Sequence, residues 1–142
     1  MNYLKCLSVR QPWAWLLVNG FKDIENRSWK TRYRGPLLIH ASKVPNLTNL
    51  TWCRDPENLY AKVHGYQAKV PALADIPLGA IVGRVTLVDC NMKYTSKWYT
   101  PGSWGWHVTD AQVFPTPIPY QGRQGLFNVP KTLLAGMGGV GE

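Results

Sequence analysis

Residues 4–29 read LKCLSVRQPWAWLLVNGFKDIENRSW, and this stretch predicts a strand, a short helix and another strand in succession. Its first seven residues alternate loosely between apolar and polar side chains, as strands do. The helix is marked at both ends, since Pro12 stands at a suitable first helical position and Gly20 follows the last apolar residue. Residues 22–29 then follow as an extended segment.

The remaining chain is rich in strand signals. Residues 80–90, AIVGRVTLVDC, are the clearest strand, and the apolar side chains of Val85 and Leu87 lie on the same face of it. Residues 35–42 predict a strand after a basic turn, and residues 104–130 predict two more, broken by three prolines. Between and after the strands we expect a partly helical segment at 56–65, a proline-rich loop at 66–79 and a fraying glycine-rich tail at 134–142.

This pattern of elements indicates the fold class. At least five strands with no regular alternation of strand and helix favour an α+β fold, a small and mostly antiparallel β-barrel flanked by short helices. A chain of 142 residues suits a single domain, with a core over about residues 4–130. The phosphate-binding motif G-x-x-x-x-G-K-[ST] is absent, and neither a cofactor nor a metal is expected.

The composition indicates a soluble protein. No apolar run approaches the roughly 18 residues that a membrane span needs. The charges near the N-terminus and the lack of a small-residue cleavage site do not suit a signal peptide. Cys6, Cys53 and Cys90 are far apart and odd in number, which argues against a disulfide framework or a zinc ribbon. We therefore expect a cytoplasmic protein with no membrane partner.

Positive charge is unevenly distributed along the chain. The net charge is +8, and residues 1–43 hold eight basic side chains against two acidic ones, which accounts for +6 of it. A concentrated basic region attracts polyanions by releasing their condensed counterions, so nucleic acid is the leading partner class. The alternative is a basic protein that its charge merely keeps soluble.

Residues 20–29, GFKDIENRSW, place four charged side chains directly after the predicted helix. If the segment is extended, one face carries Asp23, Glu25, Arg27 and Trp29. A run of charges is most often a solvated surface, and an opposite-charge cluster beside a helix end can be a plain ion-pair lattice. The spacing alone leaves these interpretations open.

Three blocks of the chain together resemble the ASCH domain (activating signal cointegrator homology), a branch of the PUA-like superfamily. The blocks are residues 7–42, 76–90 and 114–130. The most specific element is the family motif G-x-K-x-x-E-x-R, present here as Gly20, Lys22, Glu25 and Arg27. The resemblance covers roughly residues 4–130. It implies a β-barrel with flanking helices and a cleft lined by the motif, which in the family is proposed to receive RNA or a nucleotide-like ligand.

The residue type at each motif position can be explained by a physical role. Gly20 can adopt the left-handed conformation that ends a helix. Lys22 is suited to meet a phosphate, or to act as a base if burial lowers its affinity for protons. Glu25 could accept hydrogen bonds from a base edge or hold Lys22, and Arg27 could hold Glu25 or bind a phosphate.

Further candidate residues lie around the motif. Gln11 and Trp13 could supply an amide and a stacking surface, or they could be a helix cap and a core residue. His40 stands among apolar residues, as core histidines do, although the matching family block faces the cleft region. Most aromatic residues are expected in the core, but any that are exposed in the loop 96–107 would suit single-stranded nucleic acid. The expected ligand-binding residues are Gln11, Trp13, Lys22, Glu25, Arg27, Trp29, Arg32, Arg34 and His40.

Three functions are open at this point. The first is a nucleic-acid-binding module that holds RNA, a modified nucleotide or single-stranded DNA in a basic cleft. The second is a small hydrolase, because some bacterial ASCH-type proteins resemble amidohydrolases that act on N4-acetylcytidine with a lysine, a threonine and a glutamate, and ribonuclease activity is also associated with the family. Here Glu25 stands three positions after Lys22 in place of the threonine, so hydrolysis would need water activated by these two residues. The third is a protein-interaction module.

Overall fold

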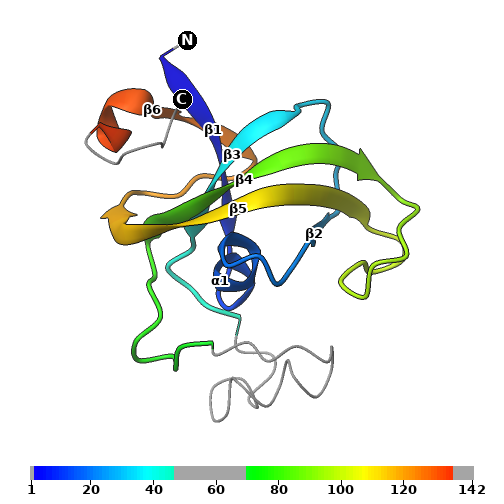
Figure 1. Cartoon of the computed structure of the whole chain (residues 1–142), viewed down its shortest axis with the longest axis horizontal. Coiled ribbons are helices and arrows are strands. Elements are labelled where there is room, and N and C mark those ends of the chain that lie inside the picture. The colour runs from blue at the N-terminus through cyan, green and yellow to red at the C-terminus, as the bar shows by residue number, and fades with distance from the viewer. Residues whose placement is uncertain (1, 47–69, 136–142) are drawn as a thin grey trace.

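The computed structural model describes residues 2–46 and 70–135, and these form strands and two short helices (Figure 1). In chain order the elements are β1 (Tyr3–Val9), α1 (Trp13–Val18), β2 (Ile24–Arg27), β3 (Gly35–Ala41), β4 (Ala80–Asn91), β5 (Trp104–Pro119), β6 (Leu126–Pro130) and the 3₁₀ helix η1 (Lys131–Leu134). The predicted strand, helix and strand of residues 4–29 are confirmed. The helical segment expected at 56–65 and most of the tail lie outside the described residues. Neither helix of the described part is long and apolar enough to cross a lipid bilayer.

One sheet contains the six strands in the order β2-β5-β4-β3-β1-β6. β1 and β3 run parallel, with Leu7 beside Ile39, and the other neighbours are antiparallel. A parallel pair needs a crossover connection, and here the crossover contains α1. Figure 1 shows α1 against one face of the sheet, where it contacts β3, β4 and β5. The predicted α+β class and mostly antiparallel sheet are confirmed.

The predicted closure of the sheet into a barrel is not found in the described residues. Their sheet has two edge strands, β2 and β6, with no backbone ladder between them. The reason lies in β2, which is only four residues long. β2 reaches β1 through a side chain, because Arg27 Nη2 donates to Ser8 O at 2.6 Å. A side-chain hydrogen bond, and not a strand ladder, therefore joins β2 to β1, the neighbour of the other edge strand β6.

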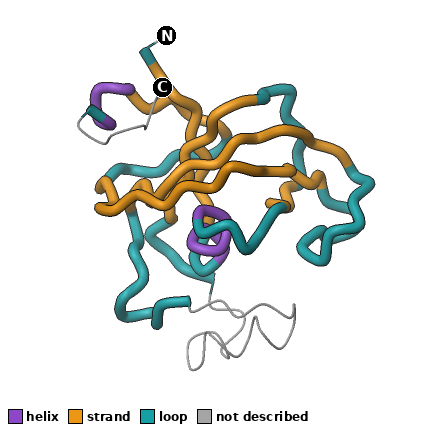
Figure 2. The backbone as a smooth tube through the Cα atoms, in the orientation of Figure 1, coloured by secondary structure: helices purple, strands orange, loops and turns teal. Residues whose placement is uncertain are grey.

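The prolines near the end of β5 do not break the strand, contrary to the sequence prediction. Val113 pairs with Gly83 and Ile118 pairs with Ile81, so β5 contributes more residues than β4 between these two points and bulges. A proline has no N–H for a ladder and is tolerated at a bulge. Figure 2 shows the long strands β4 and β5 bending along their length.

The C-terminal end of α1 sets the path into β2. Gly20 has a φ of 81°, the left-handed conformation that glycine adopts without steric cost. Its N–H donates to Leu17 O at 3.2 Å and the Phe21 N–H donates to Leu16 O at 3.0 Å, which together form a Schellman motif. The Lys22 N–H also donates to Leu16 O at 3.0 Å. The predicted role of Gly20 is confirmed, and the motif determines where Lys22 leaves the helix.

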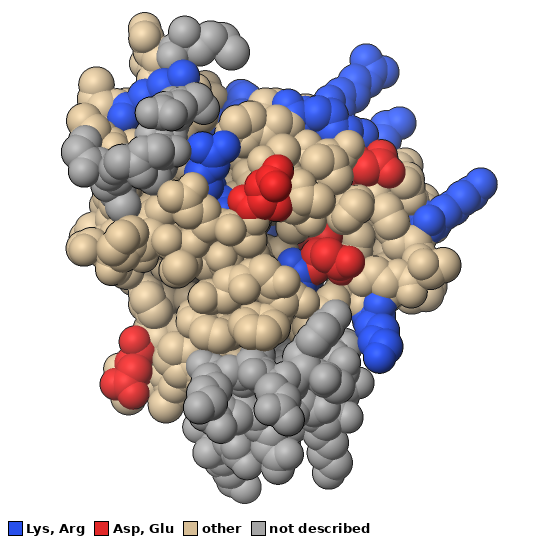
Figure 3. All heavy atoms as spheres, viewed as in Figure 1, with Lys and Arg blue, Asp and Glu red and all other residues tan. Residues whose placement is uncertain are grey.

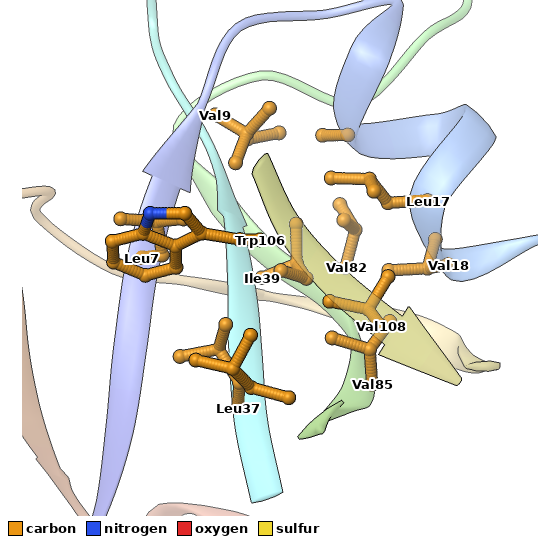
Figure 4. Packing of buried hydrophobic residues seen from close by; sticks show 13 residues of the cluster. Leu7, Val9, Leu17, Val18, Leu37, Ile39, Val82, Val85, Trp106 and Val108 are labelled. Carbon is orange, nitrogen blue, oxygen red and sulfur yellow. The ribbon is translucent and has the colours of Figure 1, made fainter. Parts of the chain in front are cut away.

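Apolar side chains pack on both faces of the sheet. Alternation along β1 directs Leu7 and Val9 toward α1, and Leu4 and Cys6 toward the opposite face. Figure 4 shows the cluster between α1 and the sheet, with side chains from the helix and four strands pointing toward one another. Its buried members are Leu7, Val9, Ala14, Leu17, Val18, Leu37, Ile39, Ala41, Val82, Val85, Leu87, Trp106 and Val108.

Candidate functional site

Two adjoining hollows open beside β2. The first has a volume of about 270 Å³ and the second of about 600 Å³. Trp13, Glu25 and Asn26 line both, so the hollows meet where α1 begins and β2 passes. These volumes are close to those of small-ligand sites.

Lys22 lies in the wall of the first hollow, and only 6% of its surface is exposed. Its Nζ donates to Ile24 O and to Glu25 Oε1, the latter at 3.2 Å. The ring centres of Trp13 and Trp98 lie 5.7 Å and 5.9 Å from the same Nζ. Aromatic faces attract cations at these distances. A carboxylate, a carbonyl and two indole rings therefore offset the cost of burying this charge.

Glu25 connects Lys22 to Arg27. Glu25 Oε1 accepts from Lys22, and Oε2 accepts from Arg27 Nε at 3.1 Å. The exposed fractions of the three side chains are 5% for Lys22, 12% for Glu25 and 23% for Arg27, so they form one largely buried unit. Two cations against one carboxylate leave this unit positive. The solvated-surface interpretation is wrong for these three positions.

Asp23 and Asn26 attach the loop that carries Trp98. Asp23 Oδ1 accepts from the Ser96 hydroxyl at 2.6 Å. Asn26 Nδ2 donates to Trp98 O at 2.8 Å, and Asn26 Oδ1 accepts from the Thr100 N–H at 2.9 Å. These bonds hold the loop after β4 against β2 and bring Trp98 to the wall of the first hollow.

The aromatic residues of the loop 96–107 are not exposed, so the core alternative applies to them. Trp98 is 4% exposed, Trp106 is fully buried and Tyr99 is half-buried. The reason is packing on neighbouring rings, since Trp106 meets Trp29 edge to face with centroids 4.7 Å apart. Trp98 nevertheless contributes to the first hollow from its buried position.

Arginines from three separate segments line the second hollow. Arg10 follows β1, Arg27 ends β2, and Arg123 lies between β5 and β6. Glu25 is the single acidic residue among the described residues that line this hollow, and its carboxylate is already ion-paired. The second hollow therefore carries unneutralised positive charge.

Gln11 was a predicted ligand-binding residue, but it lines neither hollow. It is fully buried. Its Oε1 accepts from the Trp15 N–H at 2.8 Å, and its Nε2 donates to Pro77 O at 3.1 Å. Gln11 caps the helix because Pro12, at the N-cap position, makes no side-chain bond there. This is the helix-cap alternative considered from the sequence.

His40 also lines neither hollow. Its ring is buried, with Nε2 2.7 Å from Tyr120 O and Nδ1 3.1 Å from the Ser8 hydroxyl. Burial lowers the pKa of His40, which favours the neutral ring. A carbonyl can only accept, so Nε2–H donates to Tyr120 and Nδ1 accepts from Ser8. The protein itself occupies both ring nitrogens, so a direct ligand contact by His40 stays a prediction.

Of the remaining predicted ligand-binding residues Trp29, Arg32 and Arg34, only Trp29 lines a hollow. Trp29 lines the second hollow while its ring packs on Trp106. Arg32 and Arg34 are exposed in the turn before β3 and line neither hollow. Arg34 donates to two carbonyl oxygens of its own turn and lies 3.8 Å from Asp89. Phosphate contacts by Arg32 and Arg34 stay a prediction.

Comparison with known proteins identifies the family. The ASCH domain matches residues 7–117, well over half of the chain. The chain belongs to the ASCH domain family. Activating signal cointegrator 1 of Homo sapiens is 42% identical over 86 residues, and that of Mus musculus is 41% identical over 86 residues. In both cases the similarity covers 60% of this chain and 14% of the relative, so the chain spans a small part of the curated relatives it matches.

Basic side chains outnumber acidic ones in the lining of the two hollows of this ASCH domain. The first hollow has Lys22 and Lys97 against Glu25 among its described lining residues, and the second has its three arginines. On the face shown in Figure 3, lysines and arginines project along the upper and right margins, whereas acidic side chains are scattered. Such a distribution favours an anionic ligand.

Several residues that line the hollows of the ASCH domain were missed by sequence reasoning. Asn26 could have been found, because it stands inside the family motif. The loop residues had no local signal, since their position depends on bonds to Asp23 and Asn26 more than 70 positions away. The missed residues with polar or charged side chains include Asn26, Lys97 and Thr100 in the first hollow and Ser8, Arg10 and Arg123 in the second.

Proposed function

We propose that this ASCH domain binds single-stranded RNA and holds one nucleotide across the two hollows. The observation that carries the proposal is the buried Lys22 ammonium next to the rings of Trp13 and Trp98 in the wall of the first hollow. A nucleotide combines a flat base with an anionic phosphate, so it matches a surface that offers aromatic rings and positive charge together.

Trp13 is the proposed stacking residue. It is half-buried at the start of α1 and lines both hollows. Stacking of an unpaired base on an aromatic side chain contributes roughly 1–3 kcal/mol to binding. Glu25 lines the same space, and its carboxylate oxygens can accept a further bond from a base amino group.

The dimensions and polarity of the hollows favour a single RNA strand. At about 270 Å³, the first hollow suits one ring system, whereas a duplex keeps its base faces stacked. Ser28 and Ser42 line the second hollow and offer hydroxyl groups. Such groups can bond to the 2′-hydroxyl, which distinguishes RNA from DNA.

A hydrolase that uses Lys22 and Glu25 is the second candidate. Both residues face the first hollow in direct contact, and Thr100 lines the same hollow. However, Lys22 is ion-paired with Glu25 as an ammonium, and an ammonium has no lone pair with which to act as a general base. Binding is therefore the better-supported function. Rapid turnover of N4-acetylcytidine or a short RNA, lost in both Lys22→Ala and Glu25→Ala, would reverse this order.

Replacing Trp13 with alanine is expected to weaken RNA binding by at least tenfold, since a stacking surface is lost. The measurement is fluorescence anisotropy of a labelled decauridylate at several salt concentrations. If about three phosphates are contacted, the wild-type log–log salt slope should be about −2, from roughly −0.7 per phosphate.

Trp15→Ala is the matched control for the Trp13 prediction. Trp15 stands on the same helix, stacks on Phe21 with ring centres 5.7 Å apart and lines neither hollow. Its replacement should leave the affinity nearly unchanged. Equal losses in the two variants, both shown to be folded, would refute stacking at Trp13.

A further inference from the structure

The loop between β5 and β6 brings Arg123 to the second hollow and rests on the buried His40 and the half-buried Ser8. Ser8 Oγ lies 3.1 Å from His40 Nδ1, and His40 Nε2 donates to Tyr120 O at 2.7 Å. A Cβ added at Gly122 would come within 2.6 Å of His40 Cε1 and 2.7 Å of Ser8 Oγ. Only glycine permits so close an approach of this backbone.

The start of the same loop is also held. The Tyr120 N–H donates to Gly79 O at 3.2 Å, and its ring stacks on Phe127 with an interplanar angle of 8°. These contacts and the Ser8–His40 pair act on the loop backbone, and none of them involves the charge of Arg123. The position of the Arg123 backbone is therefore determined before any ligand arrives.

Arg27 is fixed on another side of the second hollow. Its Nε donates to Glu25 Oε2, and its Nη2 donates to Ser8 O at 2.6 Å. Among the described residues these are its hydrogen bonds, so the other N–H groups of the guanidinium can meet a ligand. Arg10 is exposed and lines the same hollow.

We infer that the second hollow is a phosphodiester subsite, where Arg10, Arg27 and Arg123 bind a backbone phosphate, and that the Ser8–His40 pair positions Arg123 for this contact. The inference rests on the proposed function. It places in the second hollow the phosphate that adjoins the nucleotide whose base occupies the first hollow. The planar guanidinium matches phosphate oxygens in two-point geometry. A loop held in advance loses less conformational freedom on binding, which favours affinity.

The test uses the full chain and a 5′-fluorescein decauridylate, titrated by anisotropy at several salt concentrations. Arg123→Gln is expected to weaken binding about tenfold, because a charge-assisted bond is lost. The log–log salt slope should become less negative by about 0.7, since one phosphate contact disappears. Lys131→Gln is the control with equal charge loss. It stands in η1, where the Lys131 N–H bonds Asn2 O at the opposite end of β1, and it should leave the slope unchanged.

Positioning is tested by variants that keep every charge. Gly122→Ala should flatten the salt slope as Arg123→Gln does, because the added Cβ displaces the loop. If Gly122→Ala does not fold, Ser8→Ala replaces it, since it removes the hydroxyl that supports the loop without adding bulk. A wild-type slope in the folded variant would refute the positioning role.

The outcomes separate this inference from the proposed function. An unchanged slope in Arg123→Gln, with wild-type binding intact, overturns the subsite and leaves RNA binding standing. No binding of decauridylate by the wild-type chain contradicts the proposed function. In that case, binding of inorganic phosphate tests whether the second hollow is a phosphate subsite. A titration followed by NMR should shift the Nε–H signals of Arg27 and Arg123, and unshifted signals would overturn the inference.

Discussion

Replacing Glu25 with glutamine is expected to lower the free energy of unfolding by about 3 kcal/mol, because it leaves two cations without their carboxylate. Lys22 and Arg27 both donate to Glu25, and only 5% of the Lys22 side chain is exposed. A buried charge that loses its partner keeps its desolvation cost without the compensating attraction. Urea unfolding monitored by tryptophan fluorescence measures the effect as a lower midpoint with an unchanged slope.

An exposed ion pair provides the comparison for Glu25. Arg34 lies 3.8 Å from Asp89, with exposed fractions of 40% and 47%, so Arg34→Gln should cost less than about 1 kcal/mol. The double variant Lys22→Met/Glu25→Gln should lose less free energy of unfolding than the two single variants lose in sum, because the two residues share one interaction. If the losses of unfolding free energy for Lys22→Met and Glu25→Gln are additive and as small as that for Arg34→Gln, residues 20–29 are a solvated surface.

Replacing Gly83 with alanine is expected to destabilise the protein by about 3 kcal/mol, since it overpacks the contact between α1 and β4. An added Cβ would meet the backbone oxygen of Gln112 on β5 and lie 2.8 Å from Val18 Cβ on α1. The backbone oxygen is fixed in a ladder, so the helix or the strand has to move. Because α1 begins at Trp13, the shift should also reduce RNA affinity.

Val88→Ala is the control for Gly83→Ala. Val88 is on the same strand and 43% exposed, so its truncation should cost less than about 1 kcal/mol. The two variants are compared by urea unfolding, with the folded fraction checked before any binding measurement. A midpoint for Gly83→Ala equal to that of the wild type would show that α1 does not pack on β4 at this point.

Local signals explain which parts of the fold were predictable. Gly20 ends α1 with a positive φ because the helix end needs that conformation, and the sequence shows it directly. Closure into a barrel was not predictable in the same way, because it depends on whether the free edge of β2 gains a second backbone partner, and here β2 reaches β1 only through the Arg27 side chain. The bulge that lets β5 pass its prolines depends likewise on the register with β4.

In the candidate site, too, contacts between residues close in sequence were predictable, whereas contacts between distant segments were not. Glu25 and Arg27 are two residues apart, so an extended segment places them together, and the structure brings Lys22 to the same carboxylate. Trp98 reaches the first hollow through Asn26, which lies 72 positions earlier in the chain. Periodicity carries no information about such a contact, so the sequence left open whether Trp98 is buried or exposed.

The central claim is that a nucleotide occupies the hollows around Trp13. A ¹⁵N–¹H NMR titration of the wild-type chain with unlabelled decauridylate tests it most directly, because each indole N–H gives its own signal. We expect the signals of Trp13, Trp29 and Trp98, which line the hollows, to shift as RNA is added, while that of Trp15 stays in place. Shifts confined to Trp15 and Trp104, or no shift at saturating RNA, would contradict the claim.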